Sequence, residues 1–121
     1  REVATARQPW FIYGDTEDDF LQGDDGNDTI YGEDGLDTIY GMVGDDNLSG
    51  GEGDDLLAGL EGNDHLTGGN GDDQLFGGFD DDRLYGQAGD DHLDGGANTD
   101  TCSGSSGVDT ALQCETTSGV P

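Results

Sequence analysis

The sequence contains no lysine, only three arginines and two prolines, and few apolar residues. It carries 29 Asp and Glu residues, which give a formal net charge of −26. Phosphate backbones and anionic lipids repel such a surface, so the charge excludes a nucleic-acid partner. Hydrophobic residues make up 30% of the 121 residues. No run of them approaches the roughly 18 needed for a membrane span, so none is predicted. This composition alone is typical of a disordered chain.

The order of the residues argues against disorder, because they repeat every nine positions. The repeat runs without a slip from Gly14 to Leu112 and gives eleven consecutive units. Two of the clearest are GDDGNDTIY at 23–31 and GGNGDDQLF at 68–76. Position one is always Gly, position four is Gly in eight units, and position eight is Leu or Ile in the first nine. Position six is Asp in every unit: Asp19, Asp28, Asp37, Asp46, Asp55, Asp64, Asp73, Asp82, Asp91, Asp100 and Asp109.

Each unit is interpreted as a six-residue turn followed by a three-residue strand. Glycine and a closing Asp favour the turn, and the strand should direct position eight inward and positions seven and nine outward. Asp80 and Asn98 replace the glycine of position four and are expected to adopt its left-handed backbone, which Glu17 adopts less easily. Such short strands cannot stand alone, so the chain should coil and stack them as a solenoid.

The pattern Gly-Gly-x-Gly-x-Asp-x-Leu-x, seen in GGEGDDLLA at 50–58, resembles the RTX or haemolysin-type calcium-binding repeats of secreted bacterial proteins. The resemblance implies an all-β fold: a right-handed parallel β-roll of eleven nonapeptide units, two per coil. It also implies that calcium binds between successive coils, through the position-six aspartates and backbone carbonyls of the glycine loop. Up to about nine ions would fit. The weakest sites are expected at units one and ten, where the pattern decays.

Electrostatics independently favour a divalent cation. Stacked units n and n+2 would hold their position-six carboxylates about 4.8 Å apart. At that separation two charges repel by about 3 to 4 kcal/mol for an effective dielectric near 20. Calcium accepts six to eight oxygen ligands in flexible geometry, so it suits irregular loops, and we expect coil without it. No EF-hand loop is present. His65 and His92 should lie on opposite sides of the roll, at the surface and without a shared zinc site.

The two ends of the repeat array differ from its middle. Residues 1–13 are predicted to form an N-terminal hydrophobic cap, 14–112 the roll, and 113–121 a C-terminal tail or cap. The apolar segment PWFIY at 9–13 either covers the first coil or docks a partner or another copy. Cys102 and Cys114 are expected to form a disulfide, which suits an oxidising compartment, and two buried free thiols are the alternative.

No catalytic role is predicted, because a roll filled by one ladder of leucines leaves no substrate pocket. Tyr31 and Tyr85 should lie on one sheet and Tyr40 and Phe76 on the other, either covering the sheets or making a weak glycan or protein contact. The favoured function is an extracellular, bacterial-type, calcium-loaded structural or adhesive scaffold with a cell-surface or matrix partner. Two alternatives are open: a fibre subunit that self-associates head to tail through the roll ends, and a folding and secretion module of a larger secreted enzyme or toxin.

Overall fold

The computed structural model describes residues 2–3 and 10–119. In these residues the secondary structure consists of β-strands joined by tight turns, and no helix there has the length and apolarity to cross a bilayer. The strands are β1 (Glu2–Val3), β2 (Phe11–Asp15), β3 (Phe20–Gln22), β4 (Thr29–Asp34), β5 (Thr38–Val43), β6 (Asn47–Glu52), β7 (Leu56–Glu61), β8 (His65–Asn70), β9 (Gln74–Phe79), β10 (Arg83–Ala88), β11 (His92–Gly96), β12 (Thr101–Ser106), β13 (Thr110–Leu112) and β14 (Thr116–Ser118).

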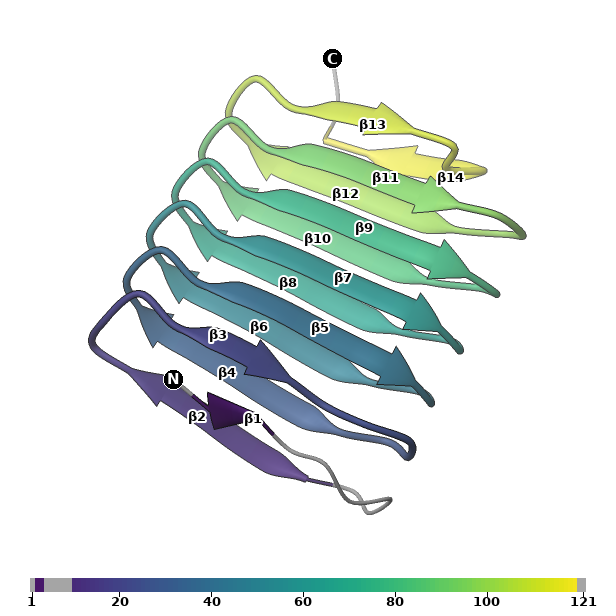
Figure 1. Cartoon of the computed structure of the whole chain (residues 1–121). Helices are drawn as coiled ribbons and strands as arrows, with labels where there is room; N and C mark the ends of the chain where they lie inside the picture. The colour runs from purple at the N-terminus through teal and green to yellow at the C-terminus, as the bar shows by residue number, and fades with distance from the viewer. Residues whose placement is uncertain (1, 4–9, 120–121) are drawn as a thin grey trace.

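The strands form two parallel sheets that face each other across a thin core (Figure 1). One sheet has the order β1-β3-β5-β7-β9-β11-β13 and the other β14-β12-β10-β8-β6-β4-β2. Consecutive strands therefore alternate between the sheets, and each strand pairs with the strand one coil away. Leu48 pairs with Leu66 and Leu66 with Leu84, an offset of two nonapeptides. The prediction of an all-β parallel roll with two units per coil is confirmed.

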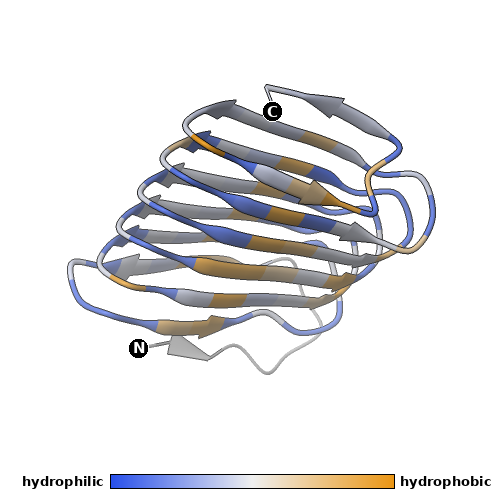
Figure 2. Ribbon diagram, turned by 90° about the horizontal axis from the view of Figure 1, so that it is seen from above, coloured by the Kyte–Doolittle hydropathy of each residue, from blue (hydrophilic) through white to orange (hydrophobic). Residues whose placement is uncertain are grey.

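The core is a single ladder of position-eight side chains. These residues lie along the middle of the strands, while hydrophilic residues occupy the turns (Figure 2). The inward direction of position eight is thus confirmed. The ladder starts before the first complete unit, at Ile12, and continues as far as Cys102: Ile12, Leu21, Ile30, Ile39, Leu48, Leu57, Leu66, Leu75, Leu84, Leu93 and Cys102 are all at most 3% exposed.

The predicted division into three-residue strands and six-residue turns is wrong. The regular strands are six residues long and extend from position seven of one unit to position three of the next, as β6 does. The turn is reduced to positions four to six. The physical reason is the two-residue alternation of a strand. Position one lies two residues beyond position eight, so its glycine also faces inward, and the extended backbone continues through it.

Sheet pairing extends beyond residues 14–112 at both ends. Ile12 in β2 pairs with Ile30, and Thr116 in β14 pairs with Thr101. Trp10 packs against the core ladder at the first coil. Pro9 lies outside the described residues. The capping role of 1–13 stays a prediction, and the structure adds that part of this segment pairs as a strand of the roll.

Left-handed backbone occurs at two positions of the unit. At position four, Asp80 (φ 74°) and Asn98 (φ 81°) adopt it, as predicted. Position two also adopts it in every unit except the second, although it is glycine in only four units. The sequence pattern did not reveal this second requirement, because side chains such as Leu60 (φ 82°) and Gln87 (φ 77°) are tolerated there.

Replacing Gln87 by glycine should therefore stabilise the roll. The left-handed region costs a non-glycine residue about 1 to 2 kcal/mol, and the greater chain entropy of glycine offsets part of the gain. We expect the free energy of unfolding to rise by about 0.5 to 1 kcal/mol, measured by thermal melting in one fixed buffer. Asp24→Gly is the matched control, because Asp24 is the one position-two residue without positive φ. An equal gain in both variants would contradict this explanation.

Candidate metal centre

The position-six aspartates line both turn edges of the roll, and all eleven are buried, with at most 7% of each residue exposed. In the ten from Asp28 to Asp109, one carboxylate oxygen, Oδ1, accepts a backbone N–H from the coil before it. The amide of Asp55, for example, donates to Oδ1 of Asp73 at 2.8 Å, and the amide of Asp73 donates to Oδ1 of Asp91 at 2.9 Å. The repeated turn thus fixes each side chain in one orientation, folded inward rather than into solvent.

The second carboxylate oxygen, Oδ2, is the unusual feature of these turns. In nine units it is buried and accepts no hydrogen bond from the part of the chain that the structure describes. Buried polar atoms nearly always have a partner, and an ionised one without a partner is costly. The residues concerned are Asp37, Asp46, Asp55, Asp64, Asp73, Asp82, Asp91, Asp100 and Asp109.

The glycine of position one explains where Oδ2 points. A Cβ built on Gly50 would overlap Oδ2 of Asp55 and lie 2.7 Å from the carbonyl oxygen of Gly68, in the next coil. The Cβ of a larger residue therefore has no room at this position, although φ there is ordinary. A carboxylate oxygen and a carbonyl oxygen thus border the same small space. The same pair of oxygens recurs beside Gly32 and Gly77.

Burial raises the pKa of eight of these carboxyl groups above the ordinary value: Asp37, Asp46, Asp55, Asp64, Asp73, Asp82, Asp91 and Asp100. Backbone N–H donors lower it again in part, and neighbouring carboxylates raise it further. The repulsion between stacked carboxylates, on which the sequence argument relied, therefore raises the pKa less than the loss of hydration does. The resulting pKa is about 8 for Asp82, about 7 for Asp46, Asp55 and Asp73, and about 6 for Asp64 and Asp91.

The donor set fits a hard cation that is held by one carboxylate and several carbonyls. Within residues 2–3 and 10–119, no three His, Cys, Asp or Glu side chains surround a common point. Backbone oxygens would therefore have to supply many of the ligands, which calcium accepts and softer metals do not. His65 lies in β8 and His92 in β11, which belong to opposite sheets. The prediction that they lie on opposite sides of the roll is confirmed.

A second ladder of hydrogen bonds runs along the outer edge of the turns, at position five. The amide of Asp72 donates to Oδ1 of Asp54 at 2.8 Å, so the donor lies in the later coil. Asn27 and Asn63 accept the equivalent bond through their side-chain oxygens. These side chains are exposed and already engaged. The sequence argument missed their role, although the run of Asp and Asn at position five was a signal for it.

Unit two departs from the common arrangement. Oδ2 of Asp28 accepts the amide of Asp24 at 3.0 Å, so this carboxylate has no unpartnered oxygen. Asp24 is also the one position-two residue outside the left-handed region. The sequence pattern gave no sign of this difference, because Asp28 occupies the same position as the other aspartates.

The aromatic residues of position nine are divided between the sheets as predicted, with Tyr31 and Tyr85 on one and Tyr40 and Phe76 on the other. Each contacts an aromatic ring of a neighbouring coil. Tyr31 stacks on Tyr13 with ring centres 5.2 Å apart, and Tyr85 packs on the ring of His65 at 5.1 Å. These pairs cover the outer sheet faces. The disulfide between Cys102 and Cys114 is present, which confirms the predicted bridge.

The fold is a parallel β-roll whose turns are lined by carboxylate and carbonyl oxygens. A comparison with protein-family profiles matches the RTX calcium-binding nonapeptide repeat over residues 13–48, 49–84 and 76–111. The matches cover most of the chain, and the chain belongs to this family. A comparison with curated proteins found no match.

Proposed function

We propose that the protein is a secreted roll that folds when it binds calcium and then acts as an extracellular structural or adhesive scaffold. The observation that carries this proposal is the row of buried Oδ2 atoms without hydrogen-bond donors. In nine of the eleven units such an atom is available as a ligand. Beside Gly32, Gly50 and Gly77 it borders the same space as a carbonyl oxygen of the next coil. The eleven position-six aspartates are the proposed side-chain ligands.

In this proposal the protein would stay unfolded in the cytoplasm and would fold only after secretion. Membership of the calcium-binding RTX repeats supports an extracellular setting, since such repeats occur in secreted bacterial proteins. A cytoplasm poor in calcium would leave the ionised roll unfolded, and calcium outside would fold it. The disulfide between Cys102 and Cys114 also suits an oxidising compartment. We propose no catalytic role for the roll, because its interior is filled by the position-eight ladder.

A pair of adjacent aspartates tests the ligand assignment. Asp55→Asn replaces the unpartnered Oδ2 by an amide nitrogen, which cannot ligate calcium, while the amide oxygen can still accept the N–H of Asp37. We expect it to remove at least one bound ion and to raise the calcium concentration at the folding midpoint severalfold. Asp54→Asn is the matched control, with the same change of charge at position five, where Asn27 and Asn63 already make the equivalent bond. Calorimetric titration measures both variants, and equal effects would contradict the assignment.

End-to-end assembly is the second candidate function, and exposed apolar residues favour it. Phe11 is 70% and Tyr13 52% exposed in β2, the outermost strand of one sheet. Leu112 is 51% exposed in β13, the outermost strand of the other sheet, and Val108, in the turn that precedes β13, is 69% exposed. A second copy stacked on either end would cover these side chains and extend both sheets. Electron microscopy in millimolar calcium would show long particles if this is correct and compact monomers if it is not.

A further inference from the structure

The turn that ends at Asp100 faces a coil for which the nonapeptide pattern supplies no aspartate. One coil earlier, the amide of Asp82 donates to Oδ1 of Asp100 at 2.7 Å. By the same rule the amide of Asp100 should donate to a carboxylate 18 residues later, at position 118. That residue is Ser118, which has no carboxylate.

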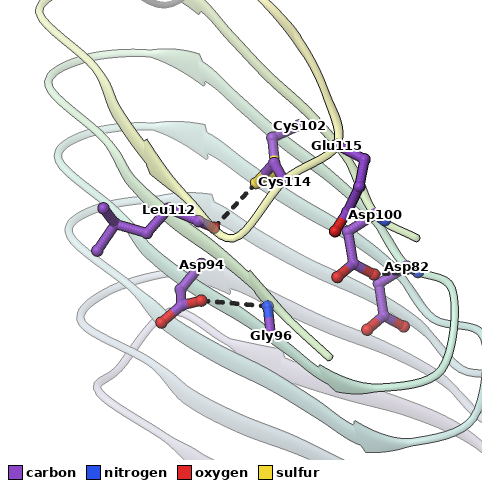
Figure 3. The surroundings of a disulfide bond; sticks show 8 residues. All are labelled: Asp82, Asp94, Gly96, Asp100, Cys102, Leu112, Cys114 and Glu115. Atoms are coloured by element: carbon purple, nitrogen blue, oxygen red, sulfur yellow. Dashed lines mark hydrogen bonds between the residues drawn. A yellow bond between two sulfur atoms is a disulfide. The ribbon is translucent and has the colours of Figure 1, made fainter. Parts of the chain in front are cut away.

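Glu115 supplies the missing carboxylate. The amide of Asp100 donates to Oε2 of Glu115 at 2.6 Å, and the two side chains lie beside Asp82 in a row (Figure 3). Glu115 can take the place of a carboxylate at position 118 because the last coil is shorter than the others. Strand β14 pairs with β12 at an offset of 15 residues instead of 18, with Thr101 opposite Thr116.

Gln113 supplies the other oxygen of the repeated arrangement. A Cβ built on Gly95 would lie 2.5 Å from the carbonyl oxygen of Gln113 and 2.7 Å from Oδ2 of Asp100. Beside Gly77, one coil earlier, the carbonyl oxygen of Gly95 occupies the equivalent place at 2.6 Å. The carbonyl oxygen of Gln113 therefore takes the place of that of a position-one glycine, although the backbone of Gln113 is left-handed (φ 52°) and that of the glycines is not.

The disulfide anchors both of these residues. Cys114 lies between Gln113 and Glu115 and is bonded to Cys102, which is fully buried in the position-eight ladder. Cys102 also lies in the strand that directly follows Asp100. The covalent bond thus joins the segment that carries the two added oxygens to the strand beside the turn that they complete.

We propose that Asp100, the carbonyl oxygen of Gln113 and the carboxylate of Glu115 form a further calcium site, and that the Cys102–Cys114 disulfide positions its last two ligands. Asp100 is fully buried, and its Oδ2 accepts no hydrogen bond from the described residues, so an unpartnered ligand atom is directed into the site. The inference rests on the proposed calcium-binding function and adds Glu115, Gln113 and redox control to it.

Calcium titration of the whole chain with Glu115→Gln tests the site. We expect the variant to bind one ion fewer, or one ion at least tenfold more weakly, than the unchanged protein. Hydrogen exchange gives the local readout: calcium should protect the amides of 110–119 in the unchanged protein and fail to do so in the variant. Glu61→Gln is the control, with the same change of charge at an exposed residue, and should bind calcium normally.

Reduction of the disulfide gives a second route to the same site. Dithiothreitol should weaken one site of the unchanged protein by a similar factor and have little added effect on Glu115→Gln, because both act on the same ligands. Normal ion count, affinity and 110–119 protection in Glu115→Gln would overturn the inference while leaving the other sites intact. Absence of calcium binding in the unchanged protein would instead overturn the proposed function itself.

Discussion

Withdrawing calcium from the protein at pH 8 should convert the roll into an expanded coil. Nine buried carboxylate oxygens have no hydrogen-bond donor among the described residues. Each unpartnered buried group costs about 1 to 3 kcal/mol, and more when it is charged. Together the nine cost about 9 to 27 kcal/mol, which is enough to cancel the roughly 5 to 15 kcal/mol by which a domain of this size is ordinarily stable. The net charge of −26 adds repulsion that favours expansion.

Small-angle scattering and circular dichroism measure this transition. The radius of gyration should rise from about 14 Å, typical of a compact domain of this length, to about 35 Å. The sheet signal in circular dichroism should be lost, and fluorescence of the single tryptophan, Trp10, should report its separation from the core ladder. Calcium should restore all three signals and an equal concentration of magnesium should not, because magnesium demands a strict octahedron. A compact roll that persists in calcium-free buffer would refute the argument.

Acidification should stabilise the roll when calcium is absent. Burial raises the pKa of Asp55 and Asp73 from the ordinary value of 3.8 to about 7, and that of Asp82 to about 8. Between about pH 4 and pH 8 the folded state therefore binds more protons than the unfolded chain, so stability falls as the pH rises. The benefit is complete below about pH 4, where both states are protonated, and is lost above about pH 8.

Circular dichroism in calcium-free buffer tests this dependence. We expect sheet structure near pH 5 and coil at pH 8, with a reversible transition between them. Protons and calcium compete for the same oxygens in the folded roll, so calcium binding to the roll near pH 5 should release protons and should weaken as the pH is lowered further. Asp73→Asn, which imitates the protonated carboxyl group, should flatten the pH dependence of the calcium-free protein. A calcium-free roll that became less stable as the pH was lowered from 8 to 5 would contradict the pKa shifts.

Some features of the site follow from residue type alone, and others depend on contacts between coils. The invariance of position-one glycine was evident in the sequence, but its reason was not. The glycine leaves room for a carboxylate of its own unit and a carbonyl of the next coil, as at Gly50. Glu115 could not be assigned because it is out of phase with the repeat, and its role depends on a pairing offset that only the folded tail reveals. Asp28, which is in phase, differs because of a local bond from Asp24.

The nine-residue period by itself determined a coiled stack of short strands, the inward Leu and Ile ladder and one aspartate in the turn of each unit. A nonapeptide with one apolar residue can bury that residue only by stacking on the neighbouring coils. The period therefore implies a solenoid. The length of the strands, the left-handed backbone at position two and the donors around each carboxylate were decided by tertiary structure. They depend on hydrogen bonds and close contacts between residues 15 to 18 positions apart, and no single unit contains them.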